Sequence, residues 1–147
     1  MAHTDKLRRQ QDAATQLMAG ITGQIGAYCG PDDACGLTLS IAQLVGLLRV
    51  HLTVEDEHLY PEMIGSGHAQ TAALARRFAR EMGGIAERLE EYALRWSSSA
   101  AIAVRFDEFC DETRRLFAVI ETRIRRENEQ LYPLADQPAR PPLRSAA

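Results

Sequence analysis

The stretch HLTVEDEHLYP, from His51 to Pro61, returns near the end of the chain as RIRRENEQLYP, from Arg123 to Pro133. Both copies have a glutamate at the fifth position and close with Leu-Tyr-Pro. They differ at the first position, where the second copy has an arginine in place of the histidine. A proline lacks a backbone donor and restricts the residue before it, so Leu-Tyr-Pro predicts the end of a helix. The repeat therefore predicts two equivalent helical segments.

Three breaker segments divide the rest of the chain: CGPDDACG at 29–36, YPEMIGSG at 60–67 and SSS at 97–99. They separate four long stretches in which apolar residues recur at three- and four-residue spacing, the pattern of an amphipathic helix. Long helices with short connections predict an all-α protein, an antiparallel up-down-up-down four-helix bundle. We assign residues 1–135 to this bundle and the Pro-rich residues 136–147 to a disordered tail.

The composition predicts a single globular domain, with 46% apolar and 25% charged residues in a chain of 147. A formal net charge of −3 and a pI of about 5.8 argue against binding to nucleic acid or to an anionic membrane. We expect no apolar run of membrane-spanning length and no signal peptide, and hence a cytoplasmic protein. The three cysteines contain no CxxC pair and are expected to be free thiols: Cys29, Cys35 and Cys110.

Polar side chains interrupt every inward-facing apolar stripe, and each stripe is interrupted at one level: by Gln11, by His51 and Glu55, by Glu81, and by Arg123 and Glu127. A buried carboxylate costs several kcal/mol unless it is paired, hydrogen-bonded or bound to a cation. Antiparallel threading places Gln11 at the height of the His51 and Glu55 pair, and the repeat places Glu127 at an equivalent height. The height of Glu81 depends on where its helix begins. Protons or a cation are expected among these glutamates.

The pair His51 and Glu55 lies one helical turn apart and could hold a metal ion, although such pairs are more often surface hydrogen bonds. Nitrogen and oxygen donors suit iron, manganese or zinc, and without thiolates iron is the natural candidate. Arg123 has no lone pair to give, so it is expected to pair with a core carboxylate such as Glu127. Glu81 could equally reach solvent from the edge of its stripe.

Glu55 and His58 also form Glu-x-x-His, a pattern of ferritin-like di-iron proteins. The matching residue in the second copy is Gln130, so only half of that pattern is present. We therefore expect His58 at the edge of its helix.

The segments LRRQQDAATQL, HLTVEDEHLYP and RIRRENEQLYPLA together resemble the hemerythrin-like (HHE cation-binding) family. The resemblance implies a four-helix bundle around a non-haem di-iron centre with oxo or carboxylate bridges. Some members of that family bind O₂ reversibly, and others are linked to sensing of nitric oxide, iron or oxidative stress. In this chain Gln11 and Arg123 stand where the family has histidines.

The resemblance assigns four metal ligands: His51, Glu55, Glu81 and Glu127. Glu55 and Glu127 would bridge two irons, and the site would bind or sense O₂, NO or iron, with no catalytic residue assigned. Two alternatives stay open. One is a metal-free or single-metal bundle that acts as an interaction module through its surface. The other is a di-iron oxidase or peroxidase.

Overall fold

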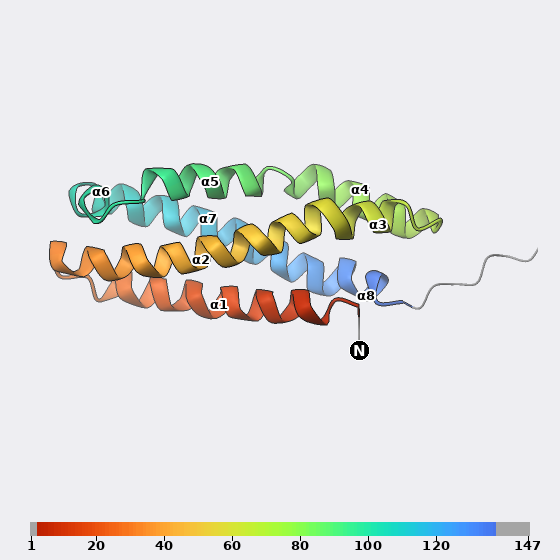
Figure 1. Ribbon diagram of the computed structural model, residues 1–147, viewed down its shortest axis with the longest axis horizontal. Coiled ribbons are helices and arrows are strands. Elements are labelled where there is room, and N and C mark those ends of the chain that lie inside the picture. The colour runs from red at the N-terminus through yellow and green to blue at the C-terminus, as the bar shows by residue number, and fades with distance from the viewer. Residues whose placement is uncertain (1–2, 138–147) are drawn as a thin grey trace, which may run out of the picture.

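The computed structural model describes residues 3–137, and among these it contains helices and no strands (Figure 1). The prediction of an all-helical protein is confirmed. The last ten residues of the predicted tail lie outside the described residues. Asp136, its first residue, is held to the start of the chain, because its carboxylate accepts hydrogen bonds from the backbone N–H and the hydroxyl of Thr4.

The helical elements follow one another closely along the chain. The first half contains α1 (Asp5–Gly26), the 3-10 turn η1 (Pro31–Asp33), α2 (Ala34–Val54), the π-helical turn η2 (Glu55–Leu59) and α3 (Tyr60–Ile64). The second half contains α4 (Ala69–Met82), α5 (Ile85–Arg95), α6 (Ser99–Val104), α7 (Phe106–Arg126), the π-helical turn η3 (Glu127–Leu131) and α8 (Tyr132–Ala135).

The long helices lie side by side in an elongated bundle (Figure 1). The helix α2 packs against α1 and α5, and α7 packs against the same two helices. In Figure 1, α4 and α5 follow each other along the side of the bundle away from α1. Side chains from the middle of α2 and α7 therefore point into one shared interior.

The interior is apolar over most of its length. Near α6 it contains Phe109, whose ring centroid lies 5.4 Å from that of Trp96 and 6.4 Å from that of Tyr92. All three aromatic side chains are buried, and such rings dominate core energetics. Toward the other end of the bundle, buried polar groups replace the apolar ones: Gln11, His51, Glu55, Arg123 and Glu127. The polar level therefore lies within the core.

The prolines predicted that each copy of the repeated stretch ends its helix at Leu-Tyr-Pro. This prediction is wrong. Each helix passes through a π-helical turn, in which the N–H of Tyr60 bonds to the carbonyl of Glu55 and that of Tyr132 to the carbonyl of Glu127. Each proline then lies at the start of the next helical segment, where its missing N–H is not needed. The wider turn thus lets the helix continue past a proline, and π-helical turns of this kind are frequent at functional sites.

By length and composition alone, the continuous segment Pro31–Ile64 could cross a membrane, because a window of 18 residues within it has a mean hydropathy of 1.5. The expectation that the chain has no such apolar run is wrong for this segment. One helix of this kind is weak evidence, because the core helix of a soluble protein has the same composition. Here the segment packs against α1 and α5 and buries Leu44, Leu48 and His51.

Candidate metal centre

Three buried side chains converge where α2 and α7 pass into their π-helical turns. One donor atom from each of His51, Glu55 and Glu127 lies within 4.8 Å of the other two, a spacing that could hold a metal ion. His51 is 3% exposed and both glutamates are 0% exposed. The repeat thus brings its two glutamates together from opposite halves of the chain.

The imidazole of His51 offers a free lone pair to this cluster. Its Nδ1 lies 2.9 Å from the side-chain oxygen of Gln10, which can only accept, so Nδ1 carries the proton. Burial lowers the pKa of His51 to about 4, so the ring is neutral near pH 7. Its Nε2 lies 3.0 Å from Oε1 of Glu55 but makes no hydrogen bond with the described residues. A neutral imidazole fixed through its other nitrogen is the usual form of a metal-binding histidine.

Two tyrosines hold the glutamates in a crosswise arrangement. Tyr60 follows Glu55 in the first copy, yet its hydroxyl donates to Oε2 of Glu127 at 2.9 Å. Tyr132 follows Glu127 in the second copy and donates to Oε2 of Glu55 at 2.7 Å. Burial is the main cause that raises the pKa of both phenols, so both stay protonated and act as donors. Each copy therefore orients the carboxylate of the other.

The guanidinium of Arg123 lies against the same carboxylates, and its Nη2 contacts the same oxygen of Glu55 that faces His51. Its Nε donates to Glu127 at 3.3 Å, and its Nη2 donates to Glu55 at 3.3 Å and to Asp56 at 3.1 Å. Its Nη1 donates to the carbonyl of Met82, the last residue of α4, at 3.1 Å. Burial opposes the charge, but the surrounding acids, Glu127 first, raise the pKa of Arg123. The arginine therefore stays charged among the carboxylates.

The two carboxylates still oppose each other. Burial, followed by the negative charge of Glu55, raises the pKa of Glu127 well above its ordinary value. Since one arginine can balance only one of the two charges, a second positive charge or a proton is needed between them.

Gln11 stands where the family resemblance expects a histidine, and it reaches the same cluster. Its amide nitrogen donates to Oε1 of Glu127 at 3.1 Å and to the hydroxyl of Tyr132 at 2.9 Å. Its buried amide oxygen finds no hydrogen-bond partner among the described residues. Two lone-pair atoms are thus unsatisfied here, on Gln11 and on His51, although buried polar atoms are normally paired. A cation bound by His51, Glu55 and Glu127 would satisfy the lone pair of His51, so this set of donors fits a metal ion.

The structure does not bring Glu81 into the cluster. Its side chain is 41% exposed and pairs with Arg126 at 2.6 Å and with Arg77 at 3.3 Å. The prediction that it faces inward is wrong, because α4 buries Phe78 and then Met82, a step of four residues rather than three. The hydrogen bond from Arg126 is the main cause that lowers the pKa of Glu81.

His58 is exposed on η2, away from the carboxylates of the cluster. Gln10, Asp56, Tyr60 and Tyr132 were not assigned to the site. The two tyrosines could have been found, because both occur in the repeated Leu-Tyr-Pro. No pattern in the sequence indicated the carbonyl of Met82.

The fold and this cluster define an all-helical protein with a buried candidate metal centre. Comparison with protein families agrees: the model of the hemerythrin HHE cation-binding domain matches residues 2–135. The chain therefore belongs to the hemerythrin HHE cation-binding family. No curated protein and no solved structure gave a significant match to the chain.

Proposed function

We propose that this protein binds non-haem iron at His51, Glu55 and Glu127. The observation that carries the proposal is the unpaired Nε2 of His51, fixed by Gln10 and directed toward two buried carboxylates. A set of nitrogen and oxygen donors without thiolate favours iron, manganese or zinc, and membership of the family favours iron. Bound iron would supply gas-binding and redox chemistry at this site.

The chain's own residues would hold and tune such an ion. Gln10 keeps the proton of His51 on Nδ1, so Nε2 can act as the donor. Tyr60 and Tyr132 fix the carboxylates of Glu127 and Glu55 by hydrogen bonds from their hydroxyls. Hydrogen bonds of this kind orient metal ligands and are often needed for full affinity.

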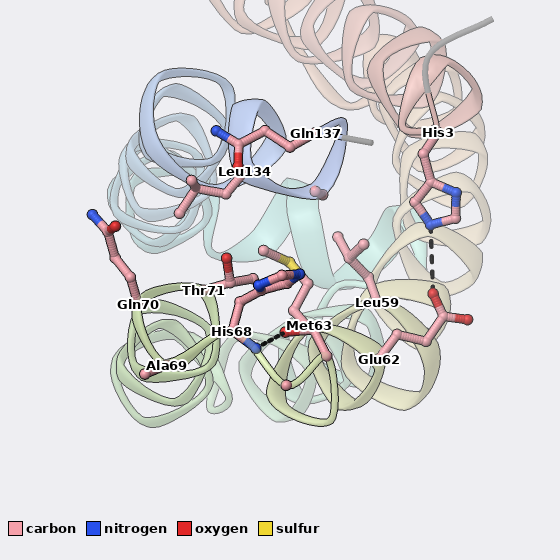
Figure 2. Close-up of a pocket in the computed structure, with 13 residues that line it drawn as sticks. His3, Leu59, Glu62, Met63, His68, Ala69, Gln70, Thr71, Leu134 and Gln137 are labelled. Atoms are coloured by element: carbon pink, nitrogen blue, oxygen red, sulfur yellow. Dashed lines mark hydrogen bonds and ion pairs between the residues drawn. The ribbon is translucent and has the colours of Figure 1, made fainter. Parts of the chain in front are cut away.

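We propose that the task of the site is to bind or sense O₂, NO or iron itself rather than to convert an organic substrate. This is supported by the position of the described pockets, about 590 and 400 Å³ in volume, neither of which is lined by a proposed ligand. The larger lies where the turn before α4 meets α8, with His3 paired to Glu62 at 3.4 Å on one side (Figure 2). An ion enclosed in the core suits a diatomic ligand better than a larger molecule.

We also propose that the chain forms an antiparallel up-down-up-down four-helix bundle. Its four helices would be α1, α2 continued by α3, α4 continued by α5, and α7. The packing of α2 and α7 each against both α1 and α5 supports this topology. A cytoplasmic location and the absence of nucleic-acid and membrane partners stay predictions from composition.

The test is the iron content of protein produced with added iron and purified without chelator. We expect His51→Ala to lose the iron, while His58→Ala, which removes an exposed histidine seven residues away, keeps it. Circular dichroism should show that both variants stay helical. Iron retained in His51→Ala, or absent from the wild type, would contradict the proposal.

A specific observation favours a second candidate, a metal-free bundle that acts through its surface. Arg123 already pairs with Glu55, Asp56 and Glu127, so it partly balances the buried acids without a metal. This candidate predicts that chelation leaves thermal stability unchanged, whereas a bound ion would raise it by mass action. The di-iron oxidase or peroxidase is a further alternative, to be tested by O₂ consumption of the reduced protein.

A further inference from the structure

The number of ions that the centre can hold follows from the two copies of the repeat, and the inference rests on the proposed iron site. The copies form two halves related by the crosswise tyrosines, with Tyr60 on Glu127 and Tyr132 on Glu55. Two equivalent halves would suit two equivalent ions. Among the positions of the two copies whose side chains contact the carboxylates, one differs: the first copy has His51 where the second has Arg123.

The first half offers a lone pair, and the second offers none. The Nε2 of His51 is unpaired, whereas a guanidinium carries donors only. Three nitrogens of Arg123 are bonded within the centre, with the acceptor atoms at 3.1 to 3.3 Å. The second half therefore lacks the nitrogen ligand and carries a positive charge in its place.

The guanidinium is also fixed in place. Its side chain is 3% exposed, and its carbon lies 5.4 Å from the ring centroid of Tyr60. It also donates to the carbonyl of Met82, where α4 ends, and a helix end leaves such carbonyls without a partner in the helix. The interruption between α4 and α5 thus supplies an anchor for Arg123, which holds it against the two carboxylates.

A second metal ion would have to share these carboxylates with a positive charge that cannot move away. In the low dielectric of a protein core, like charges a few ångströms apart repel strongly. We propose that the centre takes one metal ion, beside Glu55, Glu127 and His51, and that the guanidinium of Arg123 holds the place and the charge of a second. One residue of the second copy, Arg123, thus makes the centre unsuited to a pair of irons.

The experiment is a metal count on the full chain. Metal-free protein is loaded with excess ferrous iron without oxygen, desalted, and measured for iron per chain. We expect one iron in the wild type and two in Arg123→His, which restores a histidine to the second half. Arg126→His is the matched control, since it adds a histidine three residues later on the same helix but where the arginine pairs with the exposed Glu81. It should keep one iron.

The outcomes separate this inference from the proposed function. Two irons in the wild type would overturn the single-ion inference and leave the iron site standing. One iron in both the wild type and a folded Arg123→His would overturn it as well. Iron bound by Arg123→His but not by the wild type would show that Arg123 excludes every ion, and no iron in either would remove the iron site altogether.

A second readout does not depend on any variant. After oxidation of the wild type, a single high-spin Fe(III) should give an electron paramagnetic resonance signal that accounts for the bound iron. A coupled pair would be nearly silent and would overturn the inference. This measurement decides the question even if Arg123→His fails to fold.

Discussion

The two copies of the repeated stretch build the two sides of one centre and end in the same way, but they begin differently. In the first copy, His51 is neutral and turns an unpaired nitrogen toward the carboxylates. In the second, Arg123 is charged and turns only donors toward them. Glutamate, tyrosine and proline that both copies share can thus shape a site, while one residue decides what the site can hold.

Removal of the charged residue of the second copy should have the largest effect. Arg123→Ala leaves the carboxylates of Glu55 and Glu127 buried without their fixed cation, and loss of one partner of a buried ion pair costs about 3–5 kcal/mol. Urea unfolding of the metal-free protein measures this loss. Arg126→Ala, which breaks an exposed pair with Glu81, is the control and should cost clearly less. Equal losses in the two variants would show that the buried pair carries no special weight.

The crosswise tyrosines provide the next test. Tyr132→Phe removes a donor to Glu55 and an acceptor for Gln11, and we expect a loss of about 1–3 kcal/mol in unfolding free energy. Tyr60→Phe removes only the donor to Glu127 and should cost less. The control is Tyr28→Phe, because Tyr28 stacks on Phe106 with ring centroids 3.7 Å apart, a contact that phenylalanine keeps. A larger loss in Tyr60→Phe than in Tyr132→Phe would contradict the assigned bonds.

The anchor of Arg123 at the end of α4 can be tested through the glycines that follow Met82. A Cβ on Gly83 would lie 2.7 Å from the carbonyl oxygen of Ala79, so Gly83→Ala must shift the backbone beside the anchor. We expect a loss of about 1–2 kcal/mol, within the usual cost of overpacking. Gly84→Ala is the control, since a Cβ there meets no atom within 4 Å and alanine favours a helix. Thermal melts of both variants measure the difference, and equal melting temperatures would count against the close contact.

The smallest effect is expected where Asp136, three residues after the second copy, is tied to the start of the chain. Burial works against the charge of Asp136, but hydrogen bonds from Thr4 and the ion pair with Arg8 lower its pKa below the ordinary 3.8. A lowered carboxyl pKa stabilises the fold above the unfolded value and loses that contribution as pH falls through the folded value. Asp136→Asn should therefore cost at most about 1 kcal/mol at pH 7 and progressively less as the pH falls below 3.8. A cost in urea unfolding that grows toward acid would reverse this interpretation.

Much of the centre could be predicted from the sequence. The periodic apolar positions indicated helices, and their polar interruptions indicated a shared level at Gln11, His51, Glu55 and Glu127, which the structure buries together. Glu81 could not be predicted, because steps of three and of four residues after Phe78 both fit an inward stripe, and the packing of α4 buries Met82 instead. Spacing within a helix does not reveal its rotation where two short helices meet.

The sequence by itself determined the helices, the repeated frame and the residue types at the polar level, since these depend on local periodicity and composition. Only the tertiary structure decided which partners those residues have. After the π-helical turns, the tyrosine of each copy donates a hydrogen bond to the glutamate of the other copy. At the end of α4, the carbonyl of Met82 accepts a hydrogen bond from Arg123, 41 positions later in the chain. Such contacts join segments that are distant in the chain, so they depend on how the helices pack and not on any one helix.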